Sequence, residues 1–322
     1  MLRVRRTILL RAVVAAAGLA TVACSSPGAG PASGGSPQVS AGSAGGATGP
    51  AGHAGPGAPG PSGSPATGTT AIPAPAHTLV VMLENHSYGQ VIADPAAPFI
   101  NSVARQGVLF TSAHAVTHPS QPNYLALFSG STQGVTDDSC PQQFSAPNLA
   151  SELLAAHDTF AGYSEGLPAT GSLTCSAGGY ARKHVPWSNF SNVPASVSKP
   201  FTAIPAGNYA RLPTVSFVIP DLCDDMHDCS VAVGDSWLRQ HIGPYLNWAM
   251  THHSLLILAW DENDGSPGNQ IPLIFAGETV RPGRYSQPVT HYNVLATIEA
   301  AYGLPRIGRS AAAAPITGIW VS

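Results

Sequence analysis

Charged residues are scarce in this chain of 322 residues, which has 14 Lys and Arg and 17 Asp and Glu. They are absent from residues 25–75, which also lack Phe, Trp and Tyr and are mostly Gly, Pro, Ser, Ala and Thr. Such a segment buries too little apolar surface to offset the entropy that ordering costs. We therefore predict that residues 25–75 form a disordered linker before a folded domain at residues 76–322.

Basic residues are also too few for a nucleic-acid surface. Four of the 14 lie in the first 24 residues, and all 17 acidic residues follow them. The rest of the chain therefore carries 10 basic against 17 acidic side chains, a net charge of −7 with His neutral. This balance argues against nucleic acid as a partner. A phosphate substrate would have to meet local cations, supplied by a metal or by His.

The apolar run near the N-terminus is too short to span a bilayer comfortably, which takes roughly 20 residues. Residues 12–23 follow a basic start, a pattern typical of a secretory signal. The ending Thr21–Cys24 resembles a lipobox, and a pair of arginines leaves both general and twin-arginine export open. We expect residues 1–24 to be a lipoprotein-type signal, and the protein to be a cell-surface lipoprotein or secreted.

No CxxC spacing occurs, which argues against a metal site built from cysteines. Four cysteines remain after residue 24, and an even number outside the cytoplasm predicts two disulfides. Three pairings are possible. We favour Cys223–Cys229 with Cys140–Cys175, because the first closes a short loop around His227.

Short apolar runs alternate with helical segments, which predicts an α/β fold with helices on both faces of a mostly parallel sheet. The expected strands are 78–83, 107–112, 158–163, 213–219, 254–260 and 271–276. The expected helices lie near 96–106, 121–130, 147–157, 234–251 and 290–302, with Asp235 as a cap of the fourth. Residues 164–212 show little periodicity and are expected to form a lid or wall of a site.

Four polar clusters each follow a hydrophobic run. They are Glu84-Asn85, residues 117–123, residues 221–228 and residues 261–264. Functional groups of parallel sheets collect beyond the carboxyl ends of the strands. Their coincidence predicts a single phosphate-ester site.

Ser120 is the candidate nucleophile, in a turn stiffened by two prolines. A hydroxyl at the N-terminus of the following helix would face free backbone N–H groups, a favourable place for a phosphate. Asn123 could donate to a phosphate oxygen. From this segment alone, a capping role for Ser120 is favoured over a nucleophilic one.

The pairs Glu84-Asn85 and Asp261-Glu262 offer only oxygen ligands, which suit a hard divalent cation. Either pair alone could simply cap a loop, but two pairs at strand ends of one sheet predict a metal site. Among the 12 His, the candidates for phosphate binding or proton transfer are His118, His227 and His291. The aspartates around His227 are interpreted as a solvated acidic loop.

These clusters together resemble the bacterial phosphoesterase family of acid phosphatases and phospholipases C, in the alkaline-phosphatase-like superfamily of three-layer α/β/α hydrolases. Within it, the chain is most similar to the SapM-type secreted acid phosphatases of actinobacteria. The similarity runs from about Leu79 to Trp320 and includes Ala181-Arg-Lys-His-Val-Pro-Trp187. It implies that Ser120 is the nucleophile. Two-zinc members carry Asp-His where this chain has Asp261-Glu262, which favours a single cation here.

We therefore expect a metal-assisted acid phosphatase that hydrolyses phosphate monoesters through Ser120. Its substrate would be a phosphate-ester small molecule or a lipid head group, and it would meet the membrane only through an N-terminal lipid anchor. A phospholipase C acting on lipid head groups would use nearly the same chemistry. A non-catalytic lipoprotein that binds a phosphorylated ligand would have lost its nucleophile or metal ligands, yet every expected group is present.

Overall fold

The computed structural model of the protein describes residues 71–321. The expected signal at residues 1–24 and all of the expected linker before residue 71 lie outside the described residues. Within the described part, no helix combines the length and the apolar character needed to cross a membrane.

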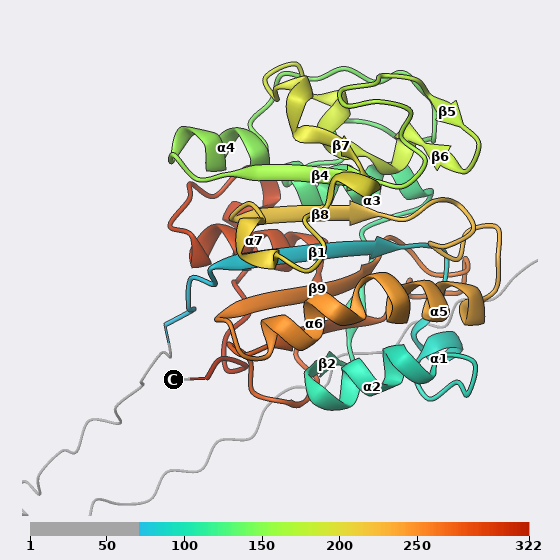
Figure 1. The fold of residues 1–322 in the computed structure, drawn as a ribbon, viewed down its shortest axis with the longest axis vertical. Helices are drawn as coiled ribbons and strands as arrows, with labels where there is room; N and C mark the ends of the chain where they lie inside the picture. Colours follow the sequence, from blue (N-terminus) through green and yellow to red (C-terminus); the bar gives the residue numbers. More distant parts are fainter. Residues whose placement is uncertain (1–70, 322) are drawn as a thin grey trace, which may run out of the picture. The chain divides into compact units, whose positions relative to one another are not determined.

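An eight-stranded mixed sheet runs through the domain in the order β11-β2-β10-β9-β1-β8-β4-β7 (Figure 1). Its strands are β1 His77–Leu83, β2 Val108–Phe110, β4 Phe160–Ser164, β7 Ser198–Pro200, β8 Val215–Ile219, β9 Ser254–Trp260, β10 Leu273–Gly277 and β11 Gly283–Tyr285. Strands β9, β1, β8, β4 and β7 are parallel, and β10 is antiparallel to both of its neighbours. Two small sheets pair β3 Ala113–His114 with β12 Val289–Thr290, and β5 Ser176–Ala177 with β6 Tyr180–Ala181.

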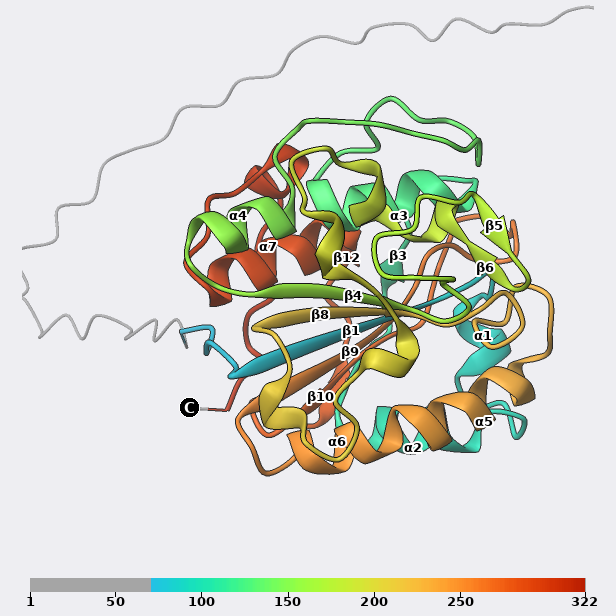
Figure 2. The same cartoon turned by 45° about the horizontal axis from the view of Figure 1, so that its top comes forward.

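Helices cover both faces of this sheet, as Figure 2 shows. They are α1 Tyr88–Val91, α2 Pro98–Gln106, α3 Ser120–Ser129, α4 Leu149–Ala155, α5 Val231–His241, α6 Gly243–Ala249 and α7 His291–Ala301. One layer contains α3, α4 and α7, and the other contains α2, α5 and α6. Because both faces are covered, every residue of β9 is buried, which explains its uninterrupted apolar run. The expected three-layer α/β/α fold is confirmed.

The helix predicted over residues 234–251 is wrong in two respects. It begins earlier, at Val231, and it is two helices, because Gly243 and Pro244 start a new one. Asp235 does not cap its own helix. It lies buried inside α5, where its carboxylate accepts the backbone N–H groups of Phe99 (3.2 Å) and Ile100 (2.8 Å) and so caps α2.

Both expected disulfides are confirmed, Cys140–Cys175 and Cys223–Cys229. The first ties the segment after α3 to residues 164–212, which are more ordered than their composition predicts. This segment contains β5, β6, β7 and several short 3-10 helices, and it buries Trp187 in the core. Residues 164–212 form one wall of the candidate active site and are called the wall segment.

Candidate active site

Three neighbouring parallel strands, β9, β1 and β8, bring their carboxyl ends together and place three of the polar clusters side by side. Backbone and side-chain bonds join these ends directly. The N–H of Glu84 donates to the carbonyl oxygen of Asp225 (2.9 Å), and that of Asp261 donates to Leu83 (2.9 Å). The N–H of Asn85 donates to Asp261 Oδ1 (3.1 Å). The loops that follow β1, β8 and β9 are therefore joined directly by hydrogen bonds.

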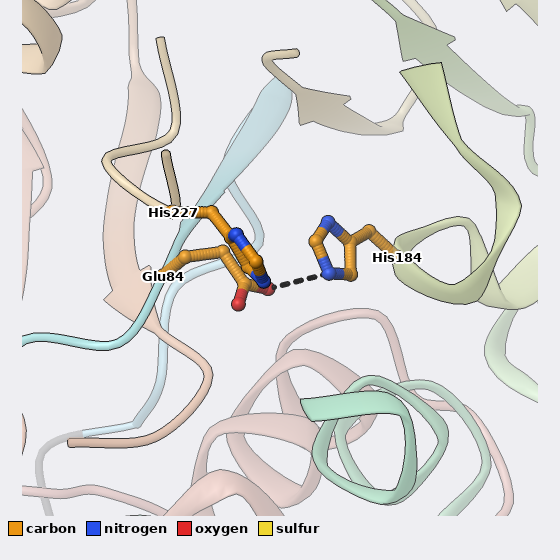
Figure 3. A group of neighbouring side chains, drawn as sticks. All are labelled: Glu84, His184 and His227. Carbon is orange, nitrogen blue, oxygen red and sulfur yellow. Dashed lines mark ion pairs between the residues drawn. The ribbon is translucent and has the colours of Figure 1, made fainter. Parts of the chain in front are cut away.

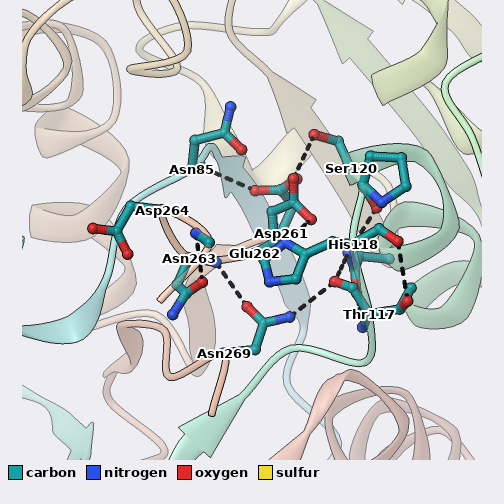
Figure 4. Close-up of polar contacts among 12 residues, drawn as sticks. Asn85, Thr117, His118, Ser120, Asp261, Glu262, Asn263, Asp264 and Asn269 are labelled. Atoms are coloured by element: carbon teal, nitrogen blue, oxygen red, sulfur yellow. Dashed lines mark hydrogen bonds and ion pairs between the residues drawn. The ribbon is translucent and has the colours of Figure 1, made fainter. Parts of the chain in front are cut away.

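Ser120 is the first residue of α3, and only 2% of its surface is exposed. Its Oγ lies 2.9 Å from Glu84 Oε2 and 3.3 Å from Glu262 Oε1, so its single proton has two carboxylate acceptors. Figure 4 shows Ser120 together with Asp261 and Glu262. The residue at the N-cap position is Pro119, and no side chain caps this helix end locally. The capping role that Ser120 could have had is therefore excluded.

The side chain of Asn123 stabilises the turn before α3 and does not face a ligand. Its Oδ1 accepts the backbone N–H groups of Val116 (3.0 Å) and Thr117 (3.1 Å). Its Nδ2 donates to the carbonyl oxygens of Thr117 (2.9 Å) and Pro119 (3.1 Å). Both ends of this fully buried amide are thus occupied by backbone. The expected bond from Asn123 to a phosphate oxygen would break the turn that positions Ser120.

Three buried carboxylates, those of Glu84, Asp261 and Glu262, gather near Ser120. Burial is the main cause that raises the pKa of all three, and repulsion between neighbouring carboxylates adds to it for Glu84 and Asp261. Asp261 Oδ2 has no hydrogen-bond partner among residues 71–321. With Asn85 beside Asp261, this oxygen-rich set is suited to a hard divalent cation, whose charge would allow the carboxylates to ionise.

His118 lies at the edge of this group. Its Nδ1 is 2.7 Å from Glu262 Oε2, while 42% of its side chain is exposed. His118 stands two positions before Ser120, the candidate nucleophile, and its direct partner is Glu262. One ring nitrogen is engaged by the carboxylate, and part of the ring remains exposed.

His184 is the site residue that sequence reasoning missed. Its Nε2 is 3.1 Å from Glu84 Oε1 and its Nδ1 is 3.4 Å from Asp225 Oδ2, although neither contact is aligned as a hydrogen bond. Its ring stacks on Tyr124 with centroids 5.0 Å apart, and Tyr124 donates its hydroxyl to Glu84. Burial is the largest cause that lowers the pKa of His184, which favours the neutral form of the ring.

Figure 3 shows that Glu84, His184 and His227 converge, with one ligand atom of each within 4.8 Å of the others. This second set mixes nitrogen and oxygen donors, and it shares Glu84 with the oxygen-rich set. His227 is also bonded through Nδ1 to Asp228 (2.7 Å), and 28% of its side chain is exposed. It therefore lies between the buried cluster and solvent.

The structure corrects the interpretation of residues 224–228 as a wholly solvated loop. Asp225 is fully buried, its Oδ1 accepts the N–H of His227 (2.8 Å), and burial raises its pKa to about 8. His184 lies in the wall segment, in a short 3-10 helix after β6, and not at the end of a strand of the main sheet. Its only sequence signal was the stretch 181–187 within the family resemblance.

His291 does not fit the role of a cationic phosphate ligand. It is buried at the start of α7, and its Nε2 is 3.0 Å from the carbonyl oxygen of Trp260. Burial lowers its pKa to about 4, so the ring is neutral at mildly acidic pH. In this position His291 anchors the end of β9, next to Asp261.

Comparisons with known proteins show which family the chain resembles. A model of the Phosphoesterase family matches residues 92–305. The chain is 56% identical over 253 residues to a phosphatidylinositol-3-phosphatase of Mycobacterium tuberculosis, covering 78% of this chain and 85% of the relative. It is 31% identical over 249 residues to an acid phosphatase of Aspergillus fumigatus, covering 71% of this chain but 55% of that longer protein.

Solved structures support the fold alone. A protein in the alkaline phosphatase superfamily from Vibrio parahaemolyticus has a TM-score of 0.52 at 12% identity, covering 76% of this chain and 71% of the other. The lipoteichoic acid synthase LtaP from Listeria monocytogenes has a TM-score of 0.54 at 9% identity, covering 73% and 74%. The chain therefore belongs to the Phosphoesterase family, and it is a phosphoric ester hydrolase with an alkaline-phosphatase-like fold.

Proposed function

We propose that this protein is a phosphomonoesterase in which Ser120 attacks the phosphorus atom. The observation that carries the proposal is the position of Ser120 Oγ, buried at the start of α3 within hydrogen-bond distance of Glu84 and Glu262. Carboxylate acceptors hold the hydroxyl proton away from the lone pair that attacks. The first residue of a helix also places phosphate oxygens near the positive end of its dipole.

In the first step the Oγ–P bond forms as the bond from phosphorus to the alcohol oxygen breaks. The Ser120 proton passes to a carboxylate, and the leaving alkoxide takes a proton from a His at the mouth of the site. His118 and His227 are the partly exposed candidates, whereas His184 is buried and holds Glu84 in place. Water then attacks the phosphorus atom and gives a proton to the His as the Oγ–P bond breaks, Ser120 Oγ takes its proton back from the carboxylate, and inorganic phosphate leaves.

A single divalent cation fits the residues present, held by Glu84, Asn85, Asp261 and Glu262. The unpartnered Asp261 Oδ2 and the crowding of three buried carboxylates support this assignment. When bound, the cation would lower the pKa of the Ser120 hydroxyl and neutralise developing negative charge. The carboxylates and Asn85 would keep their positions, because the backbone bonds between β1 and β9 already hold them together.

The proposed substrates are phosphate-ester small molecules or lipid head groups, and the name of the mycobacterial relative makes a 3-phosphorylated phosphoinositide a candidate. We also propose that the protein acts outside the cytoplasmic membrane. Two disulfides are typical of an oxidising compartment. The proposed signal, linker and lipid attachment at Cys24 would then tether the phosphoesterase domain to the cell surface.

Replacing the nucleophile tests the proposal most directly. Ser120→Ala should lower kcat for a small aryl phosphate by several orders of magnitude, because no covalent intermediate can form. Circular dichroism and cation binding should stay as in the parent protein. Ser102→Ala, on α2 in the opposite layer, is the matched control. Ser120→Ala activity within tenfold of the parent would show that another group attacks.

Removal of the cation tests the metal assignment separately. Exhaustive chelation should abolish aryl phosphate hydrolysis, and a divalent cation should restore it. If protein that elemental analysis shows to be metal-free keeps full activity, the reaction does not use a cation. The cation-loaded protein should hydrolyse aryl phosphate much faster than phosphatidylcholine, and the reverse order would identify a phospholipase C.

A further inference from the structure

A cavity of about 310 Å³ opens beside His118. Four of its lining side chains are Ser or Thr hydroxyls, and the others include His118, Tyr292 and Arg309. Its volume lies at the lower end of the range for ligand pockets, about 300–1,000 Å³. Because His118 contacts Glu262 and stands two positions before Ser120, the cavity adjoins the proposed reaction centre.

Arg309 supplies a positive charge to this cavity without a carboxylate partner. Among the described residues, no acidic group lies within ion-pair distance of its guanidinium, whereas nearby Arg306 is bound to Glu299 (2.9 Å). The backbone N–H of Arg309 donates to the carbonyl oxygen of Gly130 (2.7 Å), which fixes the residue beside the end of α3. Its guanidinium carbon lies 5.8 Å from the centre of the Tyr292 ring.

The lining of the cavity combines two kinds of polar group. His118, two residues before Ser120, and Arg309 both line it, together with four hydroxyl side chains. A lining rich in hydroxyls suits a ligand with several hydroxyls of its own. A guanidinium binds a carboxylate or phosphate through two parallel N–H donors, which gives both affinity and orientation.

We propose that this cavity receives the leaving alcohol of the substrate, and that Arg309 selects alcohols bearing several hydroxyls and a second anionic group. The inference rests on the proposed phosphomonoesterase function and adds its substrate class. A carboxylate and a second phosphate share the chemistry that Arg309 would recognise. Arg309 would act mainly on substrate binding, because it does not contact Ser120 or the carboxylates.

A matched pair of substrates tests this selection. The probes are 6-phosphogluconate and glucitol 6-phosphate, which differ only in a carboxylate against a hydroxymethyl group at the end remote from the phosphate. The parent protein should have a kcat/KM about tenfold or more higher for 6-phosphogluconate than for glucitol 6-phosphate. This difference should come from a lower KM for 6-phosphogluconate. An aryl phosphate serves as the reference substrate that lacks a second anion.

Arg309→Gln should remove the preference by raising KM for 6-phosphogluconate while leaving its kcat unchanged. The kcat and KM for glucitol 6-phosphate and for the aryl phosphate should also stay as in the parent protein. Arg309→Lys should retain part of it, because the charge stays but the paired donors are lost. Arg239→Gln, on α5 in the opposite layer, is the control and should keep the full preference.

Two different failures are distinguishable. Equal kcat/KM for the two sugar phosphates in the parent protein, or an equal loss for both in Arg309→Gln, would overturn this inference while aryl phosphate turnover upholds the proposed function. Absence of turnover with all three substrates in cation-loaded parent protein would overturn the proposed function and this inference with it.

Discussion

Glu84 contacts three other side chains of the site because it is the first residue after β1 and has no exposed surface. One carboxylate oxygen accepts the Ser120 hydroxyl, and the other accepts the Tyr124 hydroxyl and lies near His184. A carboxylate with both oxygens engaged has little freedom to rotate. Its orientation toward Ser120 therefore depends on Tyr124 and His184.

His184→Asn should lower kcat for aryl phosphate by roughly 10²-fold, since mispositioned catalytic groups commonly cost this much. The effect should appear in kcat more than in KM, because His184 acts through Glu84. His157→Asn is the control, since His157 is exposed and precedes the amino end of β4. Steady-state kinetics with thermal melts would check both variants. A normal kcat in folded His184→Asn would show that catalysis does not depend on His184.

The two disulfides act on different elements. Cys223–Cys229 closes the loop after β8 that carries Asp225 and His227, across a separation of 6 residues. Cys140–Cys175 spans 35 residues and ties the segment after α3 to the wall. Nearby, Asp138 accepts the N–H of Gln121 (2.9 Å) and pairs with Lys183 (2.8 Å), so that the same segment joins α3 to the wall.

Removing each disulfide by paired Cys→Ser substitution should therefore have different consequences. Loss of Cys140–Cys175 should lower the free energy of unfolding by about 4 kcal/mol and loss of Cys223–Cys229 by about 2 kcal/mol, because the longer loop restricts the unfolded chain more. Urea titrations measure both.

For the shorter loop, activity is the more informative readout. Loss of Cys223–Cys229 should lower kcat in the still-folded protein, and His227→Ala should reproduce most of that loss. Normal kcat in both variants would show that this bridge does not position a catalytic group. Ser139, which is exposed, and Ser172, which is half-buried, lie near the longer bridge, and changing each to Ala controls for Ser or Cys substitution near a disulfide that does not enclose His227.

At the scale of the whole molecule, the site concentrates buried acidic groups in one region. Burial raises the pKa of Asp225 to about 8 and that of Asp224 to about 6, and it raises those of Glu84 and Asp261 as well. The folded protein therefore binds more protons than the unfolded chain, whose Asp side chains titrate near pH 4. Stability from these groups is present below about pH 4 and is lost as the pH rises toward 8.

The Tm of chelated protein should therefore fall by several degrees between pH 5 and pH 8, since each kcal/mol shifts the Tm of a domain this size by roughly 2–4 °C. Added divalent cation should raise the Tm more at pH 8 than at pH 5, because it favours the ionised carboxylates. Calorimetry at both pH values gives the comparison, with Asp261→Asn as the variant that should show a smaller cation effect. A chelated Tm that rises from pH 5 to pH 8 would contradict this picture.

Local patterns in the sequence were enough to predict the central strands, both disulfides and the polar clusters at strand ends. A strand buried on both faces must be an apolar run, and parallel neighbours end at the same edge, so Glu84 and Asp261 meet once β1 pairs with β9. The order of the strands, the break between α5 and α6 and the cap that Asp235 provides to α2 depended on packing between distant segments.

Only the tertiary structure decided how the site is completed. His184 reaches Glu84 because the wall folds back over α3, and no periodic pattern marks a residue brought in by such a loop. Asp225 is buried and Asn123 is bound to backbone for the same reason: burial and hydrogen-bond partners belong to the assembled chain, not to the residue type. The sequence by itself thus determined which chemical groups are present and which strand ends carry them, while packing determined which of them face Ser120.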